Sequence, residues 1–187
     1  MNHYSILFIS LIVASSCSKA QGVDEKIRQK ILEVDNGYQL SEKSWLITEE
    51  EDTLSFQSIK GQWIILDYWT AGCKPCIEAF PVLKSISEHD SMQLKIVAIN
   101  VDKSFSKFKK YSKKYNIGYS NYFGGFTLSN PLFLPSLKLI ENEDGKSSVI
   151  TLTPQYVLID PSGKIVNRNL SKPGSKAFHE EIKIINR

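Results

Sequence analysis

The most informative segment of the chain spans residues 67–81 and reads Asp67-Tyr68-Trp69-Thr70-Ala71-Gly72-Cys73-Lys74-Pro75-Cys76-Ile77-Glu78-Ala79-Phe80-Pro81. It begins inside a nearly continuous apolar run, Trp63–Tyr68, which is typical of a strand buried on both faces. After the second cysteine, apolar residues recur at the spacing of one helical face. The pattern therefore predicts that the two cysteines lie between a buried strand and the start of a helix.

The sequence that follows predicts an α/β fold. A second buried strand over Leu94–Val101 comes after the helix, so that strand, helix and strand form a β-α-β unit. Further downstream, the spacing of apolar residues predicts helices over Ser104–Tyr115 and Lys176–Ile185, and Tyr156–Val166 has the signature of a β-hairpin. No repeat and no low-complexity linker interrupts these elements, which indicates a single globular domain.

Upstream of the cysteines, Val23–Val34 has the apolar spacing of an amphipathic helix, and Thr53–Phe56 alternates as a short strand does. The segment Tyr119–Leu152 differs from the rest of the chain. It is rich in Phe, Leu, Gly and Asn and has no clean period, so its sequence predicts no regular element.

The position of the cysteine pair suits thiol–disulfide exchange. Cys73 lies at or near a helix N-terminus, where unpaired backbone N–H groups and the helix dipole favour the thiolate over the thiol. A thiolate attacks disulfides, and Cys76, one helical turn further on, can resolve the mixed disulfide that forms. The spacing thus supplies both steps of an exchange reaction. Its direction, reduction or oxidation of the target, depends on a difference in potential of roughly 100 mV.

The same C-x-x-C spacing also makes half of a zinc site, or a static disulfide. A zinc site would need a second cysteine pair or histidines at ligand spacing, and His3, His89 and His179 stand alone in the sequence. A structural disulfide that closes so short a loop removes little entropy from the unfolded chain. Redox activity is therefore favoured over both. Neither a metal nor an organic cofactor is expected, because sulfur carries both electrons.

The stretch 67–81 resembles the active-site segment of thioredoxin-fold proteins of the AhpC/TSA-thioredoxin superfamily. It is most similar to the exported TlpA/ResA-like thiol-disulfide oxidoreductases. Trp69 matches the tryptophan at a strand end in that family, and Pro81 matches the proline that kinks the active-site helix. Thr153-Pro154 resembles the cis-proline loop, and Asp160–Ile165 resembles the hairpin D-x-x-G-K-I.

The resemblance implies a thioredoxin-like fold in which helices flank a central mixed β-sheet. It divides the chain into a leader (residues 1–20), an N-terminal extension (21–52) and a thioredoxin-like domain (53–187). An insertion at about 119–150 precedes the cis-proline loop. This insertion is expected either to line the face where a partner docks or only to cover the core. The implied partners are cysteine-containing exported proteins and an unidentified redox partner.

Chemistry and resemblance together suggest roles for the site residues. Cys73 is predicted to be the nucleophile and Cys76 the resolving thiol. Asp67 lies in an otherwise apolar strand, where burial raises the pKa of an unpaired carboxyl group. The resemblance implies that this carboxylate accepts the proton of Cys76, a role that a raised pKa suits. The plainer alternative is that Asp67 only makes a hydrogen bond at a strand edge.

Five further residues are predicted to support the site or to bind substrate: Trp69, Lys74, Pro75, Thr153 and Pro154. The cation of Lys74 would favour the Cys73 thiolate, although an exposed lysine is well screened. Pro154, if its peptide bond is cis, would present the Thr153 backbone to a bound peptide; the alternative is an ordinary proline at a strand entry. Trp69 is interpreted as packing support for the site.

Residues 1–17 resemble a targeting signal. They contain no Asp, Glu, Lys or Arg, and the apolar run Ile6–Ala14 is shorter than the roughly 20 residues that a membrane-spanning helix needs. The residues Ala14-Ser15-Ser16-Cys17 resemble the lipobox of bacterial lipoproteins, which implies that Cys17 is lipidated. Ser18-Lys19-Ala20 would instead serve for soluble export. Both routes predict a protein on the periplasmic side, where thiols are not held reduced.

Composition agrees with one globular domain behind a short leader. The chain has 187 residues, of which 42% are hydrophobic and 23% charged, and this excludes a disordered chain, collagen-like repeats and a disulfide-stapled miniprotein. The 23 basic and 20 acidic residues are too evenly balanced to predict nucleic-acid binding. We expect a monomer that meets the membrane only through a lipid anchor.

Two rival functions use the same fold. A peroxiredoxin-like thiol peroxidase would have a proline and a Thr or Ser shortly before a single peroxidatic cysteine, whereas Thr70 has no such proline and Cys76 lies one turn from Cys73. A non-catalytic module that binds copper or a peptide would need a histidine brought from afar, and neither His89 nor His179 matches a pattern of that kind. The thiol-disulfide oxidoreductase is therefore the preferred function.

Overall fold

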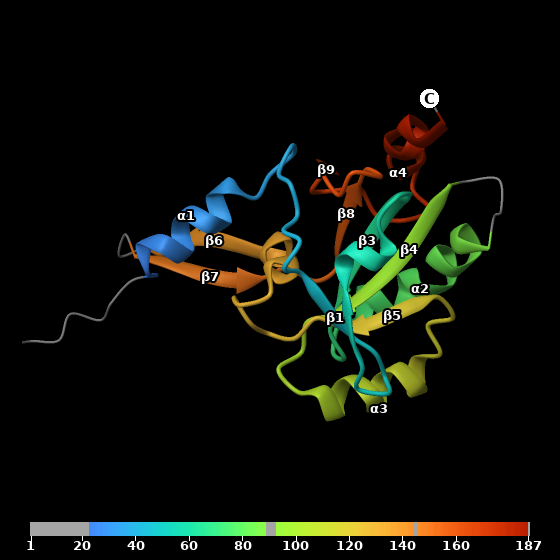
Figure 1. Cartoon of the computed structure of the whole chain (residues 1–187), viewed down its shortest axis with the longest axis horizontal. Coiled ribbons are helices and arrows are strands. Elements are labelled where there is room, and N and C mark those ends of the chain that lie inside the picture. The colour runs from blue at the N-terminus through green and yellow to red at the C-terminus, as the bar shows by residue number, and fades with distance from the viewer. Residues whose placement is uncertain (1–22, 89–92, 144–145, 187) are drawn as a thin grey trace, which may run out of the picture.

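The computed structural model describes residues 23–88, 93–143 and 146–186 (Figure 1). The leader predicted for residues 1–20, with Cys17, lies outside the described residues, so lipidation stays a prediction. Within the described ranges, no helix is both long enough and apolar enough to cross a membrane.

Seven strands form the central sheet, in the order β2-β1-β5-β4-β3-β8-β9. Their bounds are Trp45–Ile47 (β1), Thr53–Ser55 (β2), Trp63–Trp69 (β3), Leu94–Asn100 (β4), Ser120–Phe123 (β5), Gln155–Ile159 (β8) and Ile165–Asn167 (β9). Strands β3, β4 and β5 run parallel to one another. The outer strands pair antiparallel, β1 with β5 and β2, and β8 with β3 and β9. The sheet is therefore mixed, which confirms the predicted fold class.

Three helices cover one face of this sheet: α2 (Lys74–Ser87), α3 (Phe105–Tyr115) and α4 (Lys176–Glu181), which continues as the 3-10 helix η3 (Ile182–Asn186). The side chains of Ile65 and Trp69 on β3 belong to this face, because alternate residues of a strand point the same way. Asp67 lies between them and therefore faces the same helices. The helices contribute buried apolar side chains, among them Ala79, Phe80, Leu83, Phe108 and Phe178.

The opposite face is covered by the N-terminal segment and by the segment between β5 and β8. The 3-10 helices η1 (Phe56–Ile59) and η2 (Pro131–Ser136) lie on this face, and α1 (Glu25–Glu33) packs against η2. The side chains of Ile64 and Leu66 on β3 pack in one cluster with those of Ile31, Phe56 and Leu132. One part of the predicted insertion therefore completes the core, and residues 21–52 contribute α1 and β1.

The N-terminal segment also runs along the outer edge of β9. Gln39 and Lys164 form an isolated antiparallel β-bridge through their backbones. On either side of it, the Ile165 N–H donates to the Tyr38 carbonyl at 2.9 Å, and the Leu40 N–H donates to the Gly163 carbonyl at 3.1 Å. These bonds pair backbone groups that an edge strand would otherwise leave open.

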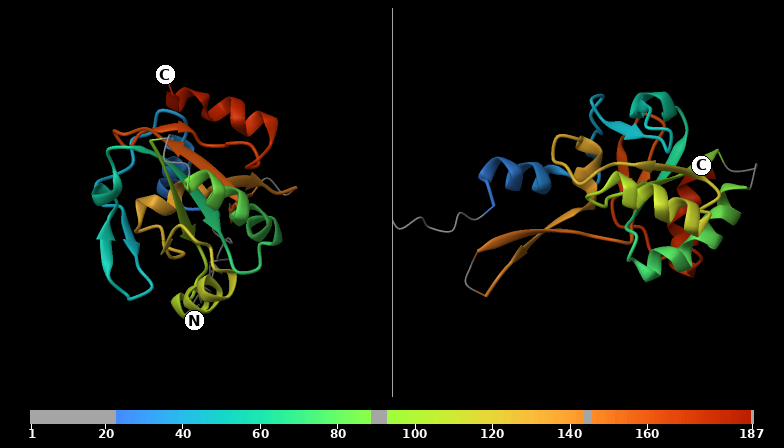
Figure 2. Two further views of the ribbon diagram at one scale, coloured as in Figure 1. Left: turned by 90° about the vertical axis from the view of Figure 1, so that its right-hand side faces the viewer. Right: turned by 90° about the horizontal axis from the view of Figure 1, so that it is seen from below.

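Helix α1 and the hairpin of β6 (Leu137–Glu141) and β7 (Ser147–Thr151) project from the central sheet as an arm (Figures 1 and 2). The two strands of the hairpin form a separate sheet. Apolar side chains join the helix to the hairpin, and Arg28 Nη1 donates to Ser147 Oγ at 2.7 Å. The arm is thus built from two segments that lie far apart in the sequence.

The elements that the sequence predicts around the cysteine pair are confirmed. The differences lie in Tyr119–Leu152, which forms β5, η2 and the β6–β7 hairpin. These elements are short, and the hairpin strands are mostly half-buried or exposed without strict alternation, which explains why no period appears in their sequence. Strand β1, Trp45–Ile47, is a further element that the sequence did not predict.

Candidate active site

Cys73 and Cys76 form a disulfide bond of 1.98 Å at the N-terminus of α2. Cys73 is the N-cap residue, and its sulfur accepts the backbone N–H of Cys76 at 3.2 Å. Pro75 lies in the first turn, where a helix N–H would have no partner within the helix. Cys73 is 8% exposed and Cys76 is fully buried. Of the two sulfurs, that of Cys73 is therefore the one within reach of another protein.

The loop before Cys73 is held from two sides at Ala71. The Ala71 N–H donates to Asp102 Oδ2 at 2.8 Å, and the Ala71 carbonyl accepts from the Tyr115 hydroxyl at 2.7 Å. The buried Asp102 carboxylate also accepts from Asn100 Nδ2 at 3.0 Å and from Lys107 Nζ at 2.7 Å. These bonds fix the backbone two residues before the reactive sulfur.

Sequence reasoning missed Asp102 and Tyr115. A signal was present for Asp102, because it follows β4, and the parallel neighbours β3 and β4 end at the same edge of the sheet. For Tyr115 there was none, since it belongs to the same aromatic spacing as the other residues of α3.

Asp67 is fully buried, and its position in β3 directs it toward the helices that include α2. The Tyr119 hydroxyl donates to Asp67 Oδ2 at 2.8 Å, whereas Asp67 Oδ1 has no hydrogen-bond partner among the described residues. Burial raises the pKa of Asp67 to about 7, and the bond from Tyr119 acts in the opposite direction. A carboxyl group of this kind can exchange a proton near neutral pH.

Trp69 anchors the strand end next to the disulfide. Its indole Nε1 donates to Asn121 Oδ1 at 3.0 Å, and its ring meets Phe80 edge-on with the ring centroids 5.7 Å apart. The side chain is fully buried and shares a cluster with both cysteines. Its contacts are those of a packing residue.

The Thr153–Pro154 peptide bond is cis. The Thr70 and Thr153 hydroxyls lie 3.4 Å apart, which joins this loop to the loop before Cys73. Pro75 and Pro154 line a shared groove of about 290 Å³, which Leu170 and Lys172 also line. The structure therefore brings the predicted supporting residues Pro75, Thr153 and Pro154 to one surface.

A second groove, of about 460 Å³, is lined by Thr70 and Thr153. It is lined by Lys103 and by Phe126, which comes from the predicted insertion and is 48% exposed. Lys103 Nζ lies 5.1 Å from the centre of the Phe126 ring. The insertion thus contributes an accessible aromatic surface beside the candidate active site, in addition to its share of the core.

Lys74 points into solvent. Its side chain is 87% exposed, and its Nζ lies 4.0 Å from Glu78 Oε1, one turn further along α2. Solvent and this carboxylate both screen the ammonium group, so its influence on the Cys73 thiolate is small. Among the described residues, no group of three or more His, Cys, Asp or Glu side chains is placed to hold a metal ion.

Comparison with known proteins adds to this geometry. The profile of the Thioredoxin-like family matches residues 61–165, which is more than half of the chain. The chain is 24% identical over 140 residues to the thiol-disulfide oxidoreductase ResA of Bacillus subtilis, which covers 72% of this chain and 70% of that protein. It is 32% identical over 112 residues to a thioredoxin of Streptomyces clavuligerus, which covers 59% of this chain and 87% of that protein.

Solved structures show the same fold. A thiol:disulfide interchange protein from Bacteroides sp. superposes with a TM-score of 0.59 at 20% identity, over 81% of this chain and 91% of that one. A secreted disulfide oxidoreductase of Mycobacterium tuberculosis superposes with a TM-score of 0.52 at 15% identity, over 74% of this chain and 91% of that one.

Proposed function

Because the chain belongs to the thioredoxin-like family and is a thiol-disulfide oxidoreductase, we propose that it exchanges its Cys73–Cys76 pair with cysteines of exported proteins. The observation that carries this proposal is the disulfide at the N-terminus of α2, in which Cys73 is 8% exposed and Cys76 is fully buried. A pair of this kind can form a mixed disulfide with a partner through one sulfur while the other thiol stays buried.

The reaction has two steps. The Cys73 thiolate attacks a sulfur of the target disulfide, which forms a mixed disulfide and releases the other target sulfur as a thiolate. Cys76 then gives its proton to Asp67 and attacks the Cys73 sulfur. This attack closes the Cys73–Cys76 bond and releases the second target thiolate. Two electrons pass from the enzyme to the target, and the same steps in reverse oxidise a target dithiol.

The proposed place of action is the periplasmic side of the membrane. The apolar leader and the lipobox-like residues that end at Cys17 support export with a lipid anchor. The secreted Mycobacterium tuberculosis oxidoreductase shows that this fold occurs outside the cytoplasm. An exported protein can keep a disulfide that the cytoplasm would reduce.

A cysteine trap tests the exchange reaction. In the Cys76→Ser variant the second step is blocked, so the target should stay bound to Cys73 through a disulfide that dithiothreitol releases. Cys73→Ser is the matched control and should capture nothing. The reduced wild-type protein should also reduce insulin disulfides, and Cys73→Ser should not. Stoichiometric retention of copper without turnover, or peroxide consumption that survives Cys76→Ser, would overturn the proposal in favour of a rival function.

The groove beside Thr153 is the proposed docking surface for the target segment. Phe126 offers apolar contact area there, and the groove reaches the loop that precedes Cys73. We expect Phe126→Ser to slow the formation of the mixed disulfide with a protein target but not with a small disulfide. Leu128→Ser is the matched control, since Leu128 is 39% exposed on the same segment but does not line the groove. If Phe126→Ser and wild type form the mixed disulfide with the protein target at equal rates, the segment only covers the core and does not dock the target.

A further inference from the structure

We propose that Tyr119 is a positioning residue of the exchange reaction: it holds Oδ2 of Asp67 and leaves Oδ1 to take the proton of Cys76. The inference rests on the proposed function, because it concerns the second step of that reaction. It starts from an asymmetry at Asp67, where Oδ2 accepts from the Tyr119 hydroxyl at 2.8 Å and Oδ1 has no partner within the described part of the chain.

The chain brings Tyr119 to this position through a tight reversal after α3. Asn116 ends the helix with φ 47°, and Gly118 follows with φ 78°, a left-handed conformation that favours glycine. Tyr119 then precedes β5 directly. Its ring packs against that of Phe80 on α2, with centroids 6.5 Å apart at 70°. The orientation of the hydroxyl is thus set by the same helix that carries the cysteines.

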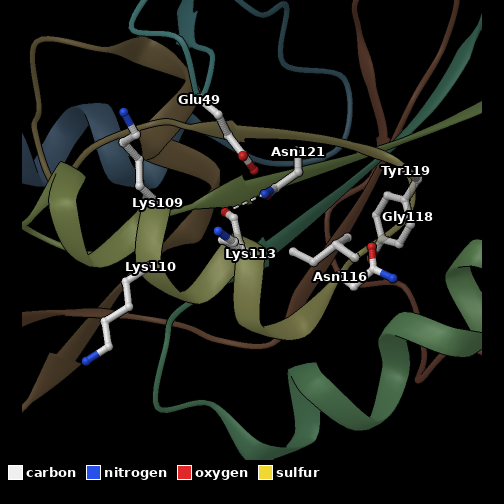
Figure 3. A pocket seen from close by; sticks show the side chains of 10 residues that line it. Glu49, Lys109, Lys110, Lys113, Asn116, Gly118, Tyr119 and Asn121 are labelled. Atoms are coloured by element: carbon white, nitrogen blue, oxygen red, sulfur yellow. Dashed lines mark hydrogen bonds between the residues drawn. The ribbon is translucent and has the colours of Figure 1, made fainter.

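Tyr119 also lines a surface pocket of about 570 Å³ beside the end of α3, together with Asn116, Gly118 and Asn121 (Figure 3). The residue therefore lies between an open pocket and a carboxylate that is itself fully buried. Neither Cys73 nor Cys76 lines this pocket. Tyr119 is accordingly outside the surface on which a target sulfur would dock.

The hydroxyl of Tyr119 can act toward Asp67 only as a donor. Burial is the main reason that its pKa lies far above the usual value, and the charge of Asp67 adds to the effect. A donor stabilises the ionised carboxylate relative to the carboxylic acid, so the bond opposes the effect of burial at Asp67. Removal of the hydroxyl should therefore leave Asp67 protonated to a higher pH.

The other groups around Asp67 do not take over this role. On β4, Ala98 pairs with Asp67 in register and carries no charge, and on β8, the register partner is Tyr156. Burial is the main reason that the pKa of Tyr156 is raised, and the charge of Asp67 adds a smaller effect in the same direction. No hydrogen bond joins these two side chains in the described structure. From α2, the Cys73–Cys76 disulfide belongs to the same cluster as Trp69, which lies on the Asp67 side of β3. Tyr119 is therefore the one described donor to the Asp67 carboxylate.

The test separates the two steps of exchange. Reduced protein is mixed with dithiobis-nitrobenzoate, which releases one coloured thiolate when Cys73 attacks and a second when Cys76 resolves. In Tyr119→Phe, which removes only the hydroxyl, the first release should be unchanged at every pH. The midpoint of the second release should move up by about one pH unit, and at pH 7 that step should be roughly fivefold slower.

Tyr122→Phe is the matched control, because Tyr122 lies on β5, three residues after Tyr119, but packs against the cluster on the opposite face of the sheet. Its second release should follow the wild-type pH profile. A titration of the Asp67 carboxyl carbon by NMR in the reduced protein gives a direct second readout, and its midpoint should rise in Tyr119→Phe.

Each failure has a separate meaning. A wild-type midpoint in Tyr119→Phe, both in kinetics and by NMR, would overturn the inference. A pH profile that Asp67→Asn leaves intact would overturn the role of Asp67 as proton acceptor and the inference with it. Absence of the second release in the wild-type protein would overturn the proposed exchange function itself.

Discussion

A single carboxylate, that of Asp102, fixes the loop that ends at the reactive cysteine. It accepts hydrogen bonds from the Ala71 N–H, from Asn100 and from Lys107. Because the group is 7% exposed, water cannot readily replace these bonds. The geometry at Cys73 thus depends on a side chain that has no part in the sulfur chemistry.

Asp102→Asn should therefore destabilise the protein and disturb the site. The amide keeps one acceptor oxygen but turns an N–H₂ group toward existing donors, so we expect the free energy of unfolding to fall by about 2 kcal/mol. The attack of Cys73 on a small disulfide should slow as well. Urea denaturation and the rate of the first thiolate release from dithiobis-nitrobenzoate check both effects.

Lys107→Met is the control for this prediction. The Lys107 side chain is 47% exposed, and an ion pair with one solvated partner contributes at most about 1 kcal/mol. Equal losses of stability in Asp102→Asn and Lys107→Met would show that the ion pair, and not the bond to Ala71, holds the loop.

The site residues that could be predicted from the sequence are those that lie close together along the chain. Cys73, Cys76 and Asp67 lie within ten residues of one another, and their types alone suggest exchange and proton transfer. Tyr119 and Asp102 reach the same site from positions next to other strands, just before β5 and just after β4. Their contacts depend on which strands become neighbours in the sheet, and no local pattern records that.

Among the elements, the segment between β5 and β8 is the least regular, yet it is firmly attached to the rest. Arg168, just after β9, donates through its guanidinium to the backbone carbonyls of Val34, Pro135 and Leu137. One side chain thus ties together the end of α1, η2 and the start of β6. Five donors in a fixed planar arrangement make arginine suited to such a junction.

Arg168→Met should lower the free energy of unfolding by about 2–3 kcal/mol, because the three carbonyl groups lose a charged donor in a half-buried position. Limited proteolysis should then cut the chain between α1 and β1, where wild type resists. Denaturation in urea measures the first effect and gel electrophoresis of the digest the second.

The control is Arg28→Met. Arg28 bonds to Ser147 and lies 3.9 Å from Glu141, but its side chain is 37% exposed, so its loss should cost less than about 1 kcal/mol. If Arg28→Met proved as costly as Arg168→Met, general loss of charge and not the bonding at this junction would be the cause.

The elements around the cysteine pair could be predicted because β3 and β4 are long and buried on both faces, which gives continuous apolar runs, and because α2 is long enough to show the period of one helical face. The β6–β7 hairpin has no such period. It packs against α1 in the arm instead of lying between two layers of the core, so burial does not alternate along its strands.

At the scale of the whole molecule, the central sheet lies between two unequal layers. Regular helices cover one face, and the N-terminal segment together with η2 covers the other. Ile31 of α1 is 3% exposed and belongs to the same cluster as Ile64 and Leu66 of β3. The N-terminal helix should therefore unfold together with the sheet.

Ile31→Ala should shift the unfolding transition of the entire protein by about 3 kcal/mol, since the substitution leaves a cavity in a shared core. Tryptophan fluorescence reports on the central sheet, because Trp45, Trp63 and Trp69 lie in β1 and β3. Leu32→Ala, at a position 56% exposed, should shift the transition by less than about 0.5 kcal/mol. An unmoved fluorescence transition in Ile31→Ala would mean that the arm unfolds on its own.

The N-terminal segment that runs along the outer edge of β9 affects how readily the protein aggregates at high concentration. Long open strand edges recruit other chains and start aggregates. Here one edge of the central sheet is occupied by residues 37–40, and the other is the three-residue strand β2, which follows the acidic run Glu49–Asp52. The five-residue strands of the β6–β7 hairpin have outer edges that are longer than that of β2. Strand-to-strand aggregation should accordingly begin at the arm, whose strand β7 ends at Thr151 in the wall of the groove beside Thr153.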